Sequence, residues 1–300
     1  MIRVLMLDLG DTLAEGNNVL PHVPEALKVL SRFETESGAQ LALALVSDYT
    51  MPEPPVTPQK VETIFADYVK ELEQLQLKNF FEPVDRHATL SAHAGVFKPD
   101  AAIFKKALQR LKLRAGLNSC LFITENAEHI AACRKLGMET LLFGPTDEAD
   151  FSDWSEAPLL IARKVAPENA QNLKLALQLR LATEFEMELV SISNSGKNPI
   201  EGRGKKLFPV KLKGDSIAVP FPVNVKISLD KDGRIRDVSS DQPDPEALAE
   251  SAHYLKTLEA NKQISRGNKA LQGNETHELK ADEKGRKVLT RRRFTATPKR

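Results

Sequence analysis

Short apolar segments alternate with amphipathic segments through the first half of the chain, and this alternation restricts its fold more than any other feature. Four segments are almost purely apolar and indicate strands: residues 2–7, 41–46, 120–124 and 140–143. Between them, apolar residues three and four positions apart predict helices over residues 24–33, 58–77, 101–112 and 127–136. Strands without polar alternation are buried on both faces, as in a parallel sheet covered by helices. The first half is therefore expected to be α/β, with a doubly wound parallel sheet.

The composition is that of a globular protein outside the membrane. The chain has 300 residues, of which 41% are hydrophobic and 28% charged, and its net charge is +1. This length favours two domains, and the near-neutral charge predicts no strong overall attraction to nucleic acid or membranes. The two cysteines, Cys120 and Cys133, show no metal-ligand spacing and indicate buried thiols in a reducing compartment. We expect a cytoplasmic protein.

Polar residues follow three of the predicted strands. Asp8 ends the first strand in the segment VLMLDLGDTL, Ser47 and Asp48 follow the second, and Thr124 and Glu125 follow a later one. The carboxyl ends of parallel strands meet at one edge of a sheet, where ligands bind. These residues therefore predict a functional site at that edge.

Simpler interpretations exist for each residue of this predicted site. Asp8 and the glycine that follows suit a turn, and Ser47 and Glu125 suit the caps of turns or helices. Lys98 suits an exposed surface, where most lysines lie. His129 fits an exposed helix better than a metal site, because its sequence neighbours lack ligand spacing.

The order of these segments resembles the haloacid dehalogenase superfamily over about the first 145 residues. The similar motifs are Asp8 with Thr12 and Leu13, then Ser47 at the end of an apolar strand. They continue with Lys98 in GVFKPDAAIFKKAL and with the segment LFITENAEHIAACRKLGM. The resemblance implies a hydrolase, in the first place a phosphatase, with this Rossmann-like sheet.

The resemblance assigns roles to the matching side chains. Asp8 would be the nucleophile that attacks phosphorus and becomes an aspartyl phosphate. Ser47 and Lys98 would hold the oxygens of the transferred phosphoryl group, and Thr12 and Asp48 would contact the substrate. The substrate class would be a phosphorylated small molecule or macromolecule.

The resemblance also implies a magnesium ion. Its ligands would be the Asp8 carboxylate, the backbone carbonyl of Gly10 and the Glu125 carboxylate. Glu125 stands where the family has aspartate, and its longer side chain alters the distances that magnesium prefers.

The second departure from the family pattern lies at Gly10. Phosphatases of the family usually have aspartate there, where it protonates the leaving group, and Asp11 is a weak substitute because it lies one residue further on. Three functions stay open. They are a phosphatase for substrates with good leaving groups, a hydrolase of a non-ester bond such as carbon–halogen, and a non-catalytic binding or regulatory protein.

The intervals between the motifs are too short for a large inserted cap domain. We expect residues 1–147 to form the sheet domain and residues 148–166 a linker, an edge strand or a docking helix. Residues 167–262 are expected to form a smaller α+β domain. It would contain a helix over 167–183, strands over 187–192, 206–212, 217–223, 225–229 and 235–238, and a helix over 245–261 capped by Asp244.

The last segment, residues 263–300, is expected to form a hairpin that turns at 283–285, followed by a basic tail. Eight basic residues and no acidic one follow residue 283: Lys284, Arg286, Lys287, Arg291, Arg292, Arg293, Lys299 and Arg300. Such a block suits an anionic partner or a solvated tail. The second half contains no catalytic constellation, because no histidine lies near Ser191, Ser193 or Ser195, and a phosphate-binding loop lacks its glycine spacing.

Overall fold

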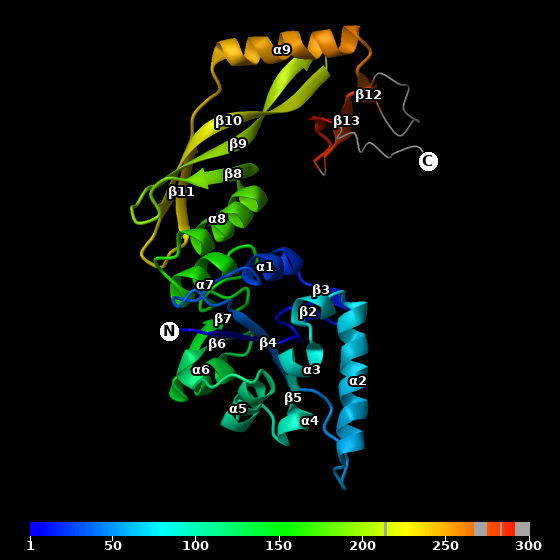
Figure 1. Cartoon of the computed structure of the whole chain (residues 1–300), viewed down its shortest axis with the longest axis vertical. Coiled ribbons are helices and arrows are strands. Elements are labelled where there is room, and N and C mark those ends of the chain that lie inside the picture. Colours follow the sequence, from blue (N-terminus) through cyan, green and yellow to red (C-terminus); the bar gives the residue numbers. More distant parts are fainter. Residues whose placement is uncertain (213–214, 267–274, 283, 292–300) are drawn as a thin grey trace. The chain divides into compact units, whose positions relative to one another are not determined.

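The computed structural model describes residues 1–212, 215–266, 275–282 and 284–291 (Figure 1). It divides into two compact units. The first comprises Met1–Arg180 and Leu229–Ile235, and the second comprises the described parts of Leu181–Ser228 and Arg236–Arg300. We describe each unit separately.

The first unit extends further along the chain than the predicted boundary at residue 147. Residues 148–166, predicted to be a linker, an edge strand or a docking helix, contain helix α7 (Ala157–Val165), whose side chains Leu159, Ile161 and Val165 are buried. Arg180, in helix α8 (Ala170–Glu184), donates to Ser155 Oγ and forms an ion pair with Glu156. Burial and polar pairing thus join residues 148–180 to the sheet domain.

The core of the first unit is the predicted parallel sheet. Its strands lie in the order β5-β4-β1-β6-β7, and all pair in parallel. Their bounds are Val4–Leu7 for β1, Ala42–Ser47 for β4, Ala88–Leu90 for β5, Cys120–Thr124 for β6 and Glu139–Leu142 for β7. The chain leaves the central strand β1 toward β4 and β5, then returns to add β6 and β7 on the other side. This reversal is the topological switch point at which such sheets bind ligands.

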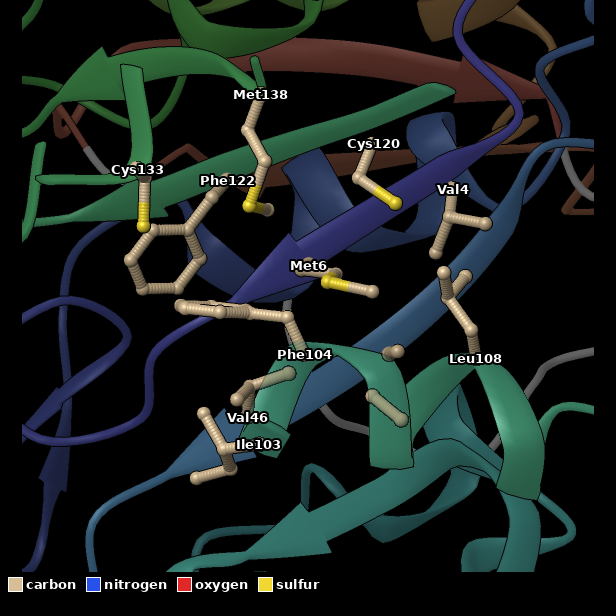
Figure 2. Packing of buried hydrophobic residues seen from close by; sticks show 12 residues of the cluster. Val4, Met6, Val46, Ile103, Phe104, Leu108, Cys120, Phe122, Cys133 and Met138 are labelled. Atoms are coloured by element: carbon tan, nitrogen blue, oxygen red, sulfur yellow. The ribbon is translucent and has the colours of Figure 1, made fainter. Parts of the chain in front are cut away.

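Helices cover both faces of this sheet, as continuous apolar strands require. In Figure 1, α1 (Val23–Leu30) and α7 lie on one side, and α5 (Ala101–Arg110) and α6 (Ala127–Lys135) lie on the other. Figure 2 shows the core between this sheet and the helices α5 and α6, where side chains of β1, β4 and β6 pack against side chains of the helices. Burial raises the pKa of both thiols in this region, to about 12 for Cys120 and about 11 for Cys133.

Further elements connect these strands. They are β2 (Ala14–Glu15), β3 (Asn18–Val19), α2 (Pro58–Gln74), the 3₁₀ helices η1 (Lys78–Phe81) and η2 (Leu117–Ser119), α3 (Val84–His87) and α4 (Ser91–Ala94). The stretch from Asp8 to Lys98 is fully described, and it contains only these connections, α1 and the strands β4 and β5. The expectation of a fold without a large inserted cap is confirmed.

The second unit is built on a seven-stranded mixed sheet. Six strands lie in the order β12-β13-β14-β10-β9-β8, and β11 also pairs with β10. Their bounds are Met187–Ile192 (β8), Ile200–Leu212 (β9), Asp215–Leu229 (β10), Ile235–Ser240 (β11), Ile264–Arg266 (β12), His277–Ala281 (β13) and Lys287–Arg291 (β14). Strand β9 begins earlier than predicted, and the two strands predicted over 217–229 are one.

Helix α9 (Pro245–Ala260) belongs to the second unit and begins as predicted. Its first turn is capped by Asp244, whose carboxylate accepts from the backbone N–H of Glu246 at 3.0 Å. Leu255 packs in a small core with Val210 and Phe221 of the sheet. This cluster is the counterpart of the core that Figure 2 shows in the first unit.

The predicted C-terminal hairpin is present as β13 and β14, which pair antiparallel. Part of its basic charge is neutralised locally, because Lys284 and Arg286 form ion pairs with Glu186, and Lys287 with Asp215 at 2.9 Å. Residue 283 of the turn and the basic residues Arg292, Arg293, Lys299 and Arg300 lie outside the described residues. No helix within the described ranges has the length and apolar character that a membrane-spanning segment needs.

Candidate active site

Asp8 occupies the centre of the sheet edge. It follows β1, whose neighbours are β4 on one side and β6 on the other. One carboxylate oxygen, Oδ1, accepts from the backbone N–H of Leu9 at 2.9 Å, and Oδ2 lies 3.0 Å from the hydroxyl of Thr124. Lys98 forms an ion pair with the same Oδ2. Asp8 is therefore a buried, paired charge and more than a residue of the turn.

Lys98 reaches this edge from the segment that precedes α5. Its side chain is only 1% exposed and that of Asp8 is 10% exposed, so the interpretation of Lys98 as an ordinary surface lysine is wrong. Its ammonium also lies 5.7 Å from the centre of the Phe122 ring, where a cation is attracted to the aromatic face. Asp48 fixes the backbone here, because its carboxylate accepts from the N–H of Lys98 at 2.8 Å.

Burial is the main influence on the pKa of the Asp8 carboxyl group. Loss of hydration is the largest influence and raises its pKa above the usual 3.8, while Lys98 and the Thr124 hydroxyl act in the opposite direction. The nearby charge of Glu125 raises the pKa of Asp8 further. The site thus combines a poorly hydrated carboxylate with one adjacent ammonium.

Ser47 ends β4, beside Asp8, and is 3% exposed. Its hydroxyl lies 2.8 Å from the hydroxyl of Tyr68 in α2. It does not cap a helix, since the next helix, α2, is capped by Thr57, whose hydroxyl accepts from Lys60 N–H. The structure thus places Ser47, Asp8 and Lys98 at one edge, as the sequence predicted.

Glu125 and Thr12 meet on the other side of Asp8. The Thr12 hydroxyl donates to Glu125 Oε2 and accepts from the Glu125 backbone N–H at 3.1 Å. The Thr124 hydroxyl lies 3.1 Å from the same Glu125 oxygen and 3.0 Å from Asp8 Oδ2, so it stands between the two carboxylates. Thr12, predicted to contact substrate, is fully buried and holds Glu125.

Glu125 does not cap the helix that follows. The cap of α6 is Asn126, whose side-chain oxygen accepts from the N–H groups of Glu128 at 3.0 Å and His129 at 3.1 Å. The Glu125 carboxylate instead contacts the hydroxyls of Thr12 and Thr124. The His129 side chain is half buried, in contrast to the exposed position expected for it.

Gly10 and Asp11 lie at the exposed rim of the site. A side chain at position 10 would meet no atom within 4 Å of its Cβ, so open space lies where the family usually has its acid. Asp11 has a left-handed backbone with φ of 53° and lines a cleft of about 600 Å³ together with Glu125, Glu15 and Glu148. Four carboxylates around this cleft disfavour an anionic ligand unless a cation offsets them.

The predicted magnesium ligands are oxygen atoms, which magnesium prefers, but only two of them are carboxylates. Asp8 and Glu125 supply two carboxylates, with the Gly10 carbonyl on the same loop, and magnesium in proteins often binds one or two carboxylates plus water. Among the described residues, no group of three or more His, Cys, Asp or Glu side chains is placed to hold a metal ion.

Two residues that contact this site were not predicted from the sequence. Trp154 is 1% exposed, and its indole N–H donates to the backbone carbonyl of Thr12 at 2.7 Å. Tyr68 lies on the buried face of α2 with Phe65 and Leu72. A buried tyrosine or tryptophan needs a hydrogen-bond partner for its O–H or N–H group. The sequence can indicate that the residue is buried, but the identity of the partner depends on tertiary packing.

No protein-family model matches the chain, and no curated protein matches it. Solved structures similar to it include a putative haloacid dehalogenase-like hydrolase from Bacillus subtilis bound to magnesium, at 14% identity and a TM-score of 0.35, covering 50% of this chain and 57% of the other. A haloacid dehalogenase-like hydrolase from Streptococcus pneumoniae has 12% identity and a TM-score of 0.34, with coverages of 50% and 92%. L-2-haloacid dehalogenase from Xanthobacter autotrophicus has 11% identity and a TM-score of 0.34, with coverages of 61% and 99%. These similarities extend over 50% to 61% of this chain.

Proposed function

We propose that the first unit is a phosphohydrolase of the haloacid dehalogenase type, with Asp8 as its nucleophile. One observation supports this most: Asp8 and Lys98 form a buried ion pair at the switch point of the sheet, beside Ser47. Burying two charges costs several kcal/mol per ion, so chains seldom retain such a pair without a role for it. The arrangement offers a carboxylate to attack phosphorus and a cation to bind the phosphoryl oxygens.

In the first step, an Asp8 carboxylate oxygen forms a bond to phosphorus while the bond from phosphorus to the leaving oxygen breaks. Lys98 and Ser47 donate to the non-bridging oxygens and offset their charge. In the second step, a water oxygen forms a bond to phosphorus while the bond from phosphorus to the Asp8 oxygen breaks. The water gives up a proton to solvent, inorganic phosphate leaves, and the Asp8 carboxylate is restored. Magnesium held by Asp8, Glu125 and the Gly10 carbonyl would neutralise phosphoryl charge when bound.

Gly10 restricts the leaving group in this proposal. No acidic side chain stands at position 10 to protonate a departing alkoxide, and such help contributes about 10²–10⁴-fold. An acyl phosphate releases a carboxylate, which needs no proton. We therefore propose acyl phosphates as better substrates than phosphate esters.

The test is to incubate the protein with magnesium and acetyl phosphate. Mass spectrometry measures the phosphoryl group on Asp8, and a colorimetric assay measures released phosphate. We expect phosphorylated Asp8 and slow release, with neither signal in Asp8→Asn. Equal phosphate release by that variant would contradict the nucleophile assignment.

A second variant tests the missing acid directly. Because a side chain at position 10 meets open space, Gly10→Asp should leave the melting temperature unchanged. It should raise the hydrolysis of a phosphate ester by about 10²-fold or more. Gly10→Asn, which adds equal volume but no acid, is the matched control and should show no gain.

Gly10 is also compatible with a substrate that has a carbon–halogen bond. A halide ion leaves carbon without being protonated, so no acid is needed at position 10. Asp8 would then attack carbon and release halide. Chloride released from a 2-chloroacid, with no Asp8 phosphorylation, would support this function. If neither reaction occurs, the non-catalytic binding protein is the better interpretation.

A further inference from the structure

The hydroxyl of Tyr68 contacts Ser47, the predicted phosphoryl-binding serine. Tyr68 lies in α2 and is fully buried, and its hydroxyl oxygen is 2.8 Å from Ser47 Oγ. The two residues are 21 positions apart, so the contact is made by tertiary packing between α2 and the end of β4.

At 2.8 Å either hydroxyl can be the donor, and a protonated Tyr68 phenol can donate to Ser47. Burial raises the pKa of the Tyr68 phenol far above 10, and the charge of Asp8 raises it further, so the phenol keeps its proton. A serine hydroxyl has one proton and two acceptor lone pairs. When Tyr68 donates to Ser47, the serine proton is available for another acceptor.

The loop after β4 is fixed around this contact. Tyr49 packs its ring edge against Tyr68 with 5.2 Å between ring centres. The Tyr49 backbone is held by Ser91, which accepts from its N–H at 3.0 Å and donates to its carbonyl at 2.8 Å. Asp48, between Ser47 and Tyr49, binds the backbone of Lys98. Ser47 and Lys98 are therefore oriented by one connected set of contacts.

We propose that Tyr68 is a positioning residue that orients the Ser47 hydroxyl, so that the serine donates its proton to a phosphoryl oxygen of the substrate bound at Asp8. The role rests on the proposed function of the site. Tyr68 does not touch the substrate in this scheme and acts through Ser47.

The test compares Tyr68→Phe with Tyr49→Phe, Ser47→Ala and the double variant Tyr68→Phe/Ser47→Ala. Tyr49→Phe is the matched control, because it removes the same oxygen from the adjacent ring. The rate of Asp8 phosphorylation is measured against acetyl phosphate concentration, which separates the maximal rate from the half-saturating concentration. Melting temperatures show whether each variant is folded.

We expect Tyr68→Phe to reduce the maximal rate about 10- to 100-fold, because the serine proton is no longer directed at the phosphoryl group. Tyr49→Phe should leave the rate near that of the wild type. In the Ser47→Ala background, Tyr68→Phe should have no further effect, because the two residues act as one unit. A purely structural tyrosine would instead lower the melting temperature and leave the rate unchanged.

Two results would overturn the role of Tyr68 alone. The first is a Tyr68→Phe rate equal to that of Tyr49→Phe, and the second is an equal loss with and without Ser47. If the wild type is not phosphorylated, calorimetric titration of the same variants with inorganic phosphate replaces the rate. Weaker phosphate binding in Tyr68→Phe but not Tyr49→Phe would then support the role, whereas no binding by the wild type would overturn the proposed function and the role together.

Discussion

The buried ion pair of the first unit and the ion-pair cluster around Glu186 in the second unit differ in exposure. In the first unit, Asp8 and Lys98 have side chains 10% and 1% exposed. In the second unit, Glu186 forms ion pairs with Lys284 and Arg286, and these three side chains are 32%, 62% and 37% exposed. Water solvates the second cluster and is largely excluded from the first.

Burial of the Asp8–Lys98 pair therefore lowers the free energy of unfolding, whereas the exposed cluster around Glu186 has little effect on it. Burial raises the pKa of Asp8 despite the adjacent lysine, so the fold holds that carboxylate in an unfavourable place. Hydrogen bonds from Lys284 and Arg286 lower the pKa of Glu186, as ordinary surface pairing does. Of the two, the unfavourable cluster is the better indicator of function.

Breaking the buried pair should give the largest effect. Lys98→Met leaves the Asp8 carboxylate buried without its cation, and we expect a loss of about 3 kcal/mol in the free energy of unfolding at pH 7. Chemical denaturation measures this loss. The loss should shrink at lower pH, because protonation then neutralises Asp8.

The control is Lys164→Met, which removes an exposed lysine of the same unit that pairs with Glu139 at 2.9 Å. Its effect should be much smaller and independent of Asp8. Equal losses in the two variants would mean that the Asp8–Lys98 pair is not the special feature that we infer.

His93 gives an intermediate effect and extends the comparison to a half-buried imidazole. Burial, followed by the charges of Arg110 and Lys106, lowers its pKa to about 4, whereas the unfolded chain has the usual 6.5. Between these values the unfolded state binds more protons, so the free energy of unfolding falls as the pH drops from 6.5 toward 4. The His93 contribution to this fall is smaller than the full shift would give, because the side chain is partly exposed and water screens it.

His93→Asn should remove this part of the pH dependence. Asparagine keeps an acceptor for the backbone N–H of Leu90, which His93 Nδ1 now binds at 3.0 Å, but it does not titrate. Denaturation curves at several pH values measure the slope. The exposed His253 of α9 is the control, and an unchanged slope in His93→Asn would assign the acid sensitivity elsewhere.

The smallest effect is expected at the exposed cluster. Glu186→Gln should lower the melting temperature only slightly at low salt, and the difference should vanish at high ionic strength because exposed charges are screened. A large loss that persists in high salt would show that this cluster is as important to its unit as Asp8 and Lys98 are to theirs.

The sheet of the first unit was predictable because its strands are short, apolar and separated by clear helix patterns. The bounds 120–124 agree at both ends. The second unit was harder, and the strands predicted over 217–223 and 225–229 form one strand, β10, which contains Pro220 and Pro222. Both prolines lie on its exposed face, while Phe221 and Val223 are buried, so the alternation continues through them.

Only those residues of the site that lie at the ends of strands could be placed from the sequence. Asp8, Ser47 and Glu125 follow parallel strands, and the topology alone brings them to one edge. The partners that orient them were not predictable, because the Tyr68 contact depends on how α2 packs against β4. Sequence patterns report which face of a helix is buried, but not which polar atom lies opposite.

The hydrogen bond from Trp154 to the carbonyl of Thr12 has a practical consequence. The chain contains a single tryptophan, so its tryptophan fluorescence comes from one place. That place is joined directly to the loop that follows Asp8 and, through the Thr12 hydroxyl, to Glu125. Any ligand that displaces this loop would change the emission of the indole, and the protein therefore has a built-in optical probe that needs no label and no knowledge of the substrate.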